Sequence, residues 1–142
     1  MTFKSFRITN RYENTLLSIA IGIIYLWFGT LKFFPELSPA EDLAKRTIQL
    51  LTFGIIPSSI SILILAFVEV VIGLCLIFNF YSKQIVKIAI VHIIFTFSPL
   101  FFFTEESFTT TILTPTLLGQ YIGKNLIIIA ALFTILKEKV KV

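Results

Sequence analysis

Residues 60–80 read ISILILAFVEVVIGLCLIFNF, an apolar run that contains a single charged residue, Glu69. About 20 helical residues cross the roughly 30 Å of hydrocarbon in a bilayer, and this run is long enough to do so. Three further runs, at about 15–34, 85–103 and 121–136, are similarly apolar. None of them alternates apolar and polar residues as the strands of a membrane barrel do. The sequence therefore predicts an all-α, polytopic membrane four-helix bundle.

The composition of the whole chain supports this fold class. Its 142 residues are 56% hydrophobic and 14% charged, and the mean hydropathy is +0.94. An ordinary soluble domain is roughly 45–50% apolar and about 25% charged. A chain of this length forms one domain, and we take residues 1–142 as that domain. Its interior cannot hide so many apolar side chains, so a lipid bilayer must cover much of its surface.

Several classes of function are disfavoured by the residues present. The formal net charge is +4, but the basic residues lie at the ends of the apolar runs and form no stripe with aromatics, which argues against nucleic acid as a partner. The lone cysteine, Cys75, can form no intramolecular disulfide and has no partner for a metal or redox motif. There is no paired-histidine haem motif, phosphate-binding loop or nucleophile with an evident base. We therefore predict no metal site, and no motif establishes catalysis.

The distribution of lysine and arginine predicts the orientation in the membrane. Basic residues gather before the first run, between the second and third, and after the fourth: Lys4, Arg7, Arg11, Lys83, Lys87, Lys137, Lys139 and Lys141. In a four-span chain these segments share one side, which we predict to be cytoplasmic and to hold both termini. A cleaved signal peptide is the alternative for the first run, but the run is too long and no small-x-small site follows it.

The first outer loop carries the signals of a helix. Residues 38–41 read SPAE, in which a cap residue precedes a proline and an acid. Apolar residues then recur at roughly helical spacing as far as Leu51, and Gly54 and Pro57 predict where the helix stops. We expect an additional amphipathic helix that lies on the outer interface or folds over the bundle. A plain connector is the alternative.

The second outer loop, residues 104–120, is rich in threonine. Residues 108–113 favour an extended conformation. Just before this loop, Pro99 predicts a kink in the third span, which frees backbone groups that could line a cavity.

Four ionisable residues stand inside or at the ends of the spans: Lys32, Glu69, His92 and Lys124. A charged side chain at the centre of a membrane helix costs roughly 2.5–3.5 kcal/mol on insertion scales. At 1.5 Å per residue, Glu69 lies roughly 14 Å below the outer surface. We expect a polar cluster of Lys32, Glu69 and Lys124 in the outer half of the bundle, with His92 beneath or beside it. Its candidate neighbours are Tyr25, Trp27, Gln120, Tyr121 and Asn125.

Each of these residues also has a purely structural interpretation. Lys32 and Lys124 can anchor helix ends at the interface. His92 can be a packing residue on an apolar helix. Glu69 can form an ion pair that fixes the register of two helices.

Three segments, which follow one another along the chain in the order expected for the family, resemble the DoxX-like superfamily and, within it, the YkgB-type membrane proteins. The segment Trp27–Pro35, WFGTLKFFP, is similar to a G-x-x-K-F pattern at the end of the first helix. Glu69 followed by Gly73-Leu74 resembles an E-x-x-x-G-L pattern in the second. The segment Gly119–Leu126, GQYIGKNL, resembles a G-x-Y-x-x-K-N/D pattern that opens the last.

The resemblance implies a four-helix protein of the bacterial inner membrane. It links the chain to thiosulfate:quinone oxidoreduction or to oxidative and reactive-chlorine stress, and it makes Lys32, Glu69 and Lys124 the polar positions of the family. We therefore expect a small subunit or accessory protein of a membrane redox system, with a quinone-like or small polar ligand and a redox partner subunit or a second copy. The alternative is a non-enzymatic scaffold or permeation protein whose buried charges are structural.

Overall fold

The computed structural model describes residues 3–38, 40–80 and 83–140, and within them the side chains of residues 14–38, 40–80 and 83–137. Some residues used above lie outside the described side chains: Lys4, Arg7, Arg11, Pro39, Lys139 and Lys141. In the described ranges the chain forms helices and no strand, which confirms the all-α prediction. The helices are α1 Phe3–Leu31, α2 Glu41–Leu51, α3 Ser58–Ile77, α4 Lys83–Phe95, α5 Pro99–Phe102, α6 Thr104–Ser107, α7 Leu117–Gly123 and α8 Asn125–Val140.

Four helical segments of the described chain are long and apolar enough to cross a membrane, which confirms the predicted number of spans. They are Asn14–Leu31, Ser58–Ile77, Lys83–Phe102 and Leu117–Lys137. Each boundary differs from the prediction by one to four residues, and two of these differences have a local cause. The first helix ends at Leu31 and not at residue 34, because the Lys32 amide bonds to the Gly29 carbonyl in a tighter turn. The fourth span begins at Leu117 and not at residue 121, because Thr116 caps α7 with its side chain.

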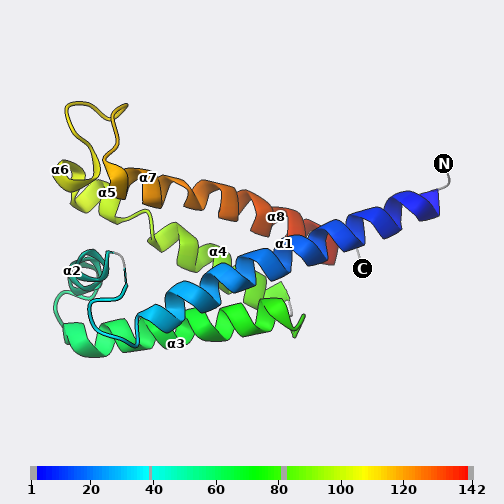
Figure 1. The fold of residues 1–142 in the computed structure, drawn as a ribbon, viewed down its shortest axis with the longest axis horizontal. Coiled ribbons are helices and arrows are strands. Elements are labelled where there is room, and N and C mark those ends of the chain that lie inside the picture. Colours follow the sequence, from blue (N-terminus) through cyan, green and yellow to red (C-terminus); the bar gives the residue numbers. More distant parts are fainter. Residues whose placement is uncertain (1–2, 39, 81–82, 141–142) are drawn as a thin grey trace.

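The spanning helices pack as two pairs (Figure 1). α1 lies along α3, and α4 lies along α8. The start of α1, the end of α8, the end of α3 and the start of α4 lie toward one end of the bundle, which we call the terminal end. The opposite end holds α2, α5 and α6, and we call it the α2 end.

Three glycines allow α1 and α3 to approach each other closely. A Cβ built on Gly22 would lie 2.8 Å from the carbonyl oxygen of Gly73, and one built on Gly73 would lie 2.7 Å from the amide nitrogen of Leu26. Nearer the α2 end, a Cβ on Gly29 would lie 2.8 Å from the Cβ of Glu69. Small residues at helix interfaces in membranes permit such contacts between backbones. This approach places the last turn of α1 beside Glu69.

The apolar core fills the terminal half of the bundle. Ile72 and Leu76 of α3 pack with Val86 of α4 and with Leu132 and Ile135 of α8, and each of these side chains is at most 2% exposed. Because lipid is as apolar as these side chains, the helices are held together here by close packing and dispersion. All four spanning helices meet at this core.

α2 lies across the other end of the bundle, and Figure 1 shows it nearly end-on between α3 and α5. Leu43 and Thr47 are buried on its inner side. The predicted amphipathic helix is thus confirmed. It ends at Leu51, three residues before the predicted stop at Gly54, because Phe53 already adopts a left-handed φ of 53° and Gly54 follows with a φ of 75°. Its predicted start was wrong by two residues. The N-cap is Ala40 and not Ser38, because Ala40 adopts the left-handed conformation with a φ of 59°.

The second outer loop is more compact than its sequence suggests. α4 ends at Phe95 and α5 begins at Pro99, so the predicted kink is a break filled by tight turns. The extended backbone predicted for residues 108–113 is wrong for most of that segment. One isolated bridge pairs Phe108 with Pro115, and the residues between them turn back because the Thr114 amide and hydroxyl both donate to the Thr111 carbonyl.

A polar cavity at the α2 end

Lys32 and Glu69 form an ion pair inside the bundle. Lys32 follows the last residue of α1, and Glu69 lies in the middle of α3. The Lys32 ammonium donates to Glu69 Oε2 over 2.6 Å and to the Phe28 carbonyl over 3.4 Å. The two side chains are only 11% and 10% exposed. The predicted approach of a lysine from the end of α1 to this carboxylate is therefore present.

His92 of α4 approaches the same carboxylate from another helix. Its Nε2 lies 3.5 Å from Glu69 Oε1, which is beyond a good hydrogen bond, and this buried nitrogen has no hydrogen-bond partner among the described residues. Its Nδ1 lies 3.0 Å from the hydroxyl of Tyr25. That hydroxyl also lies 3.1 Å from the Ala89 carbonyl oxygen. One chain of polar contacts thereby links α1, α3 and α4.

The protons of Tyr25, His92 and Glu69 can be placed in two ways. A tyrosine hydroxyl has one proton to donate, and a neutral imidazole has one donor and one acceptor nitrogen. If Tyr25 donates to Nδ1, then Nε2 carries the proton of His92 and faces Glu69. If Tyr25 donates to Ala89, then His92 donates from Nδ1 and its bare Nε2 faces the carboxylate, which is favourable only when Glu69 is itself protonated. The direction of the Tyr25 hydrogen bond therefore decides whether His92 or Glu69 carries the proton at their contact.

A third polar contact joins α8 to the turn after α4. The Asn125 side-chain amide donates to Thr96 Oγ1 over 2.8 Å, and Thr96 donates onward to the Ile93 carbonyl over 2.6 Å. Asn125 is the first residue of α8, so this bond fixes the start of α8 inside the fourth span, which begins at Leu117. The amide oxygen of Asn125 is not used by that bond and remains an acceptor for a ligand.

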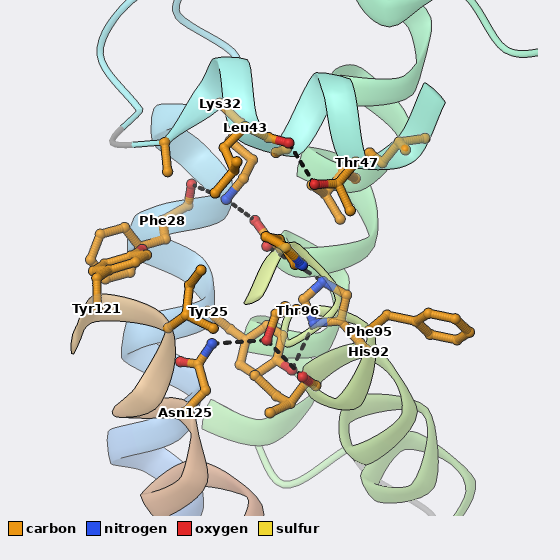
Figure 2. A pocket seen from close by; sticks show the side chains of 18 of the residues that line it. Tyr25, Phe28, Lys32, Leu43, Thr47, His92, Phe95, Thr96, Tyr121 and Asn125 are labelled. Atoms are coloured by element: carbon orange, nitrogen blue, oxygen red, sulfur yellow. Dashed lines mark hydrogen bonds and ion pairs between the residues drawn. The ribbon is translucent and has the colours of Figure 1, made fainter. Parts of the chain in front are cut away.

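These groups line one cavity of about 200 Å³. Figure 2 shows Lys32 reaching down from the end of α1, with Leu43 and Thr47 of α2 above the polar side chains. Tyr121 of α7 lies against Phe28 in an edge-to-face contact, with ring centroids 5.8 Å apart. The polar groups in the wall are Tyr25, Lys32, Thr47, Glu69, His92, Thr96, Tyr121 and Asn125. An apolar cavity of about 150 Å³ holds one benzene molecule, so this cavity has room for a single substituted ring.

The structure leaves Lys124 outside this cluster. It is the residue between α7 and α8, it is exposed, and it does not line the cavity. Two of the candidate neighbours, Trp27 and Gln120, are also exposed and outside the cavity wall. Thr96 and the inner face of α2 are the lining groups that sequence reasoning missed. Thr47 could have been found, because it shares a helical face with Leu43 and Leu51.

We found no family model, no curated protein and no solved structure that matches this chain. Its function must therefore be argued from the cavity. Among the described side chains, no group of three or more His, Cys, Asp or Glu residues could hold a metal ion. The cavity offers instead an ammonium, a carboxylate, an imidazole and an amide, which together can bind a small polar group and exchange protons with it.

Proposed function

We propose that the chain is a small subunit or accessory protein of a membrane redox or oxidative-stress system, and that it binds a quinone-type ring in the polar cavity. The observation that carries this proposal is the cavity of about 200 Å³, with Lys32, Glu69 and His92 in its wall. A membrane protein keeps such groups inside the bundle at a cost, and intramembrane ionisable residues mark ligand or proton sites by default.

The chemistry of a quinone fits these groups. Its two carbonyl oxygens accept hydrogen bonds, and its reduction to the quinol takes up two electrons and two protons. Lys32 has three N–H donors, of which two are used by Glu69 and Phe28, so one is left for a carbonyl oxygen. Glu69 and His92 would exchange protons with the ring. The electrons would come from a partner protein.

The family and the location belong to the same proposal. The resemblance to DoxX-like, YkgB-type proteins supports a place in the bacterial inner membrane. The basic residues Lys83 and Lys87 lie at the start of α4, at the terminal end of the bundle, and the positive-inside rule then favours cytoplasmic termini. The α2 end would face the periplasm.

Permeation of a small solute has less support than ligand binding. The terminal half of the bundle is packed with buried apolar side chains, and Ile72, Leu76 and Leu132 lie between the polar cavity and the terminal end. A path for a polar solute would need hydrogen-bonding groups along this half. The cavity is therefore better described as a binding site than as part of a path through the bundle.

The proposal is tested by removing the polar groups while keeping the fold. The double variant Lys32→Met/Glu69→Leu replaces a buried ion pair by apolar side chains of similar length, a change that proteins often tolerate. We expect it to insert and fold, and to lose binding of a short-chain benzoquinone at least about tenfold, as a lost charge-assisted hydrogen bond of 1.5–3 kcal/mol implies. Lys124→Met removes an exposed lysine outside the cavity and should bind as wild type does. Unchanged binding in a folded double variant would contradict the proposal.

A further inference from the structure

A second, wholly apolar cavity adjoins the polar one. Its volume is about 160 Å³, and the two cavities share Ile48 of α2 and Leu65 of α3 in their walls. The rest of its wall is Ile56, Ser61, Ile64 and Val68. The Ser61 hydroxyl donates to the Ser58 carbonyl over 2.8 Å, so it needs no polar partner in the cavity. The second cavity can therefore hold a hydrocarbon group.

This second cavity lies on the side of the bundle that faces lipid. Leu65 and Val68 belong to the α3 span, and Ile64 beside them is 51% exposed. Across from α3, Phe95 of α4 lines the polar cavity and is 56% exposed. Figure 2 shows its ring pointing away from the polar side chains. Figure 1 shows α4 diverging from α3 toward the α2 end. Leu65 of α3 and the exposed Phe95 of α4 both line the polar cavity, so this cavity borders the hydrocarbon between the two helices.

The aqueous side of the polar cavity is covered by α2. Arg46 of α2 donates to both carboxylate oxygens of Glu106 on α6, each over 2.7 Å. The same guanidinium lies over the ring of Phe103, 4.5 Å from its centroid. Paired N–H···O bonds of this kind are among the stronger contacts between side chains. Together with the buried Leu43 and Thr47, they hold α2 across the mouth that would otherwise open to water.

We propose that the two cavities are one binding site for a membrane-borne amphiphile, whose polar ring lies at Lys32, Glu69 and His92 and whose single hydrocarbon chain lies along α3 between Ile48, Leu65 and Val68. The ligand enters from the lipid between α3 and α4, beneath α2. This inference rests on the proposed function for the chemistry of the ring. It adds the chain, its place and the route of entry.

The test compares two probes that differ only in the chain: a benzoquinone with a decyl substituent and the same benzoquinone without it. Binding is measured to the full chain in lipid nanodiscs, with retention by empty nanodiscs subtracted. Affinities are referred to the concentration of each probe in the lipid, because the chain leaves lipid and not water. Close packing in the apolar cavity should then make the decyl probe bind at least about threefold more tightly than the short probe, since a few improved contacts of about 0.1–0.2 kcal/mol each suffice. The groove variants Ile56→Trp and Ile64→Trp fill the apolar cavity from the loop after α2 and from α3, and neither residue lines the polar cavity. Each should bring the affinity for the decyl probe down to that for the short probe and leave the affinity for the short probe unchanged.

The matched control is Leu63→Trp, which adds the same bulk to the lipid-facing side of α3 at a residue that lines neither cavity. It should bind both probes as wild type does. A thermal unfolding curve identifies any variant that fails to fold, and having one groove variant in the loop after α2 and one on α3 keeps the test decisive. Equal affinities for the two probes, or decyl binding untouched in both folded groove variants, would overturn the inference and leave the proposed function standing. No binding of either probe to wild type would overturn both.

Discussion

The Lys32 ammonium lies 2.6 Å from Glu69 Oε2 at a place where both side chains are about nine-tenths buried. The contact joins the end of α1 to the middle of α3, the two helices that pack most extensively in the bundle. Both charged groups lose contact with water when this pair forms, so each charge is stabilised in the interior only by the other. The pair is thus the point where stability and the proposed ligand chemistry meet.

Removal of one member of this pair should cost more than removal of both. We expect Lys32→Met or Glu69→Leu alone to lower the free energy of unfolding by about 3–5 kcal/mol, because each leaves an uncompensated buried charge. The double variant should lie close to wild type. Unfolding in mixed detergent micelles, analysed as a double-mutant cycle, measures the coupling. Single effects that simply add would show that the two side chains do not depend on each other.

The packing of α1 on α3 should be equally sensitive to single methyl groups. Gly22→Ala and Gly73→Ala place a Cβ within 2.8 Å of backbone atoms of the facing helix, so the helices must separate. We expect each to lower the free energy of unfolding by about 1–3 kcal/mol, the usual cost of overpacking. Gly123→Ala is the matched control, because a Cβ there meets nothing within 4 Å. It should be neutral, or stabilising by roughly 0.5–1 kcal/mol, because alanine is the better helix residue. Equal losses at all three positions would contradict this account of the interface.

The spans and the central ion pair could be predicted from the sequence. The spans follow from local hydropathy, and the depth of a residue follows from the constant helical rise of about 1.5 Å per residue. These depths predicted that Lys32 and Glu69 lie close enough to form a pair. The direction of a side chain around the helix does not follow from depth. Lys124 and Asn125 are neighbours at one depth, but consecutive helical residues point about 100° apart. Asn125 therefore reaches Thr96, while Lys124 is exposed.

The covering of the cavity could be predicted only in part. The sequence signals predicted α2 itself, but its partner Glu106 is 60 residues away from Arg46 in the chain, and no local pattern pairs the two. The start of α2 was misplaced for a related reason. The conformation of Ala40 is set by how the loop after α1 must turn, which is a property of the packed bundle and not of residues 38–41.

The position of α2 should depend on pH through the Arg46–Glu106 pair. The hydrogen bonds from Arg46 hold the pKa of the Glu106 carboxyl below its ordinary value. A carboxyl whose pKa is lowered in the folded state contributes stability that is fully present above its ordinary pKa, about 4.3, and is lost as the pH falls through the lowered value. We expect amide protection in α2, corrected for intrinsic exchange rates, to be constant near neutral pH and to fall in that acidic range.

Amide protection in α2, measured at neutral pH in variants of the pair, separates the effect of the Arg46–Glu106 pair from other effects of acid. Glu106→Gln should lower it at neutral pH, and high salt should do so in wild type because the pair is exposed and screened. Glu105→Gln is the matched control, because it changes an adjacent carboxyl that is not in the Arg46 pair. If Glu105→Gln loosens α2 as much as Glu106→Gln does, the pair is not what holds the helix.

The proton arrangement around His92 should be visible directly, because His92 is the only histidine in the chain. Oε2 of Glu69 accepts from the Lys32 ammonium, so an ionised carboxylate presents its other oxygen to Nε2. A bare nitrogen facing that oxygen at 3.5 Å would be repelled, and we therefore expect the proton of His92 on Nε2, with Nδ1 accepting from Tyr25.

Nitrogen-15 NMR of labelled histidine distinguishes the two tautomers. Tyr25→Phe should move the Nδ1 resonance toward that of an unbonded nitrogen, and Tyr121→Phe, which removes the other tyrosine hydroxyl of the cavity wall, should not. A proton found on Nδ1 in wild type would contradict this expectation. It would mean that Tyr25 donates to Ala89 and that Glu69 is protonated where it faces the bare Nε2 of His92.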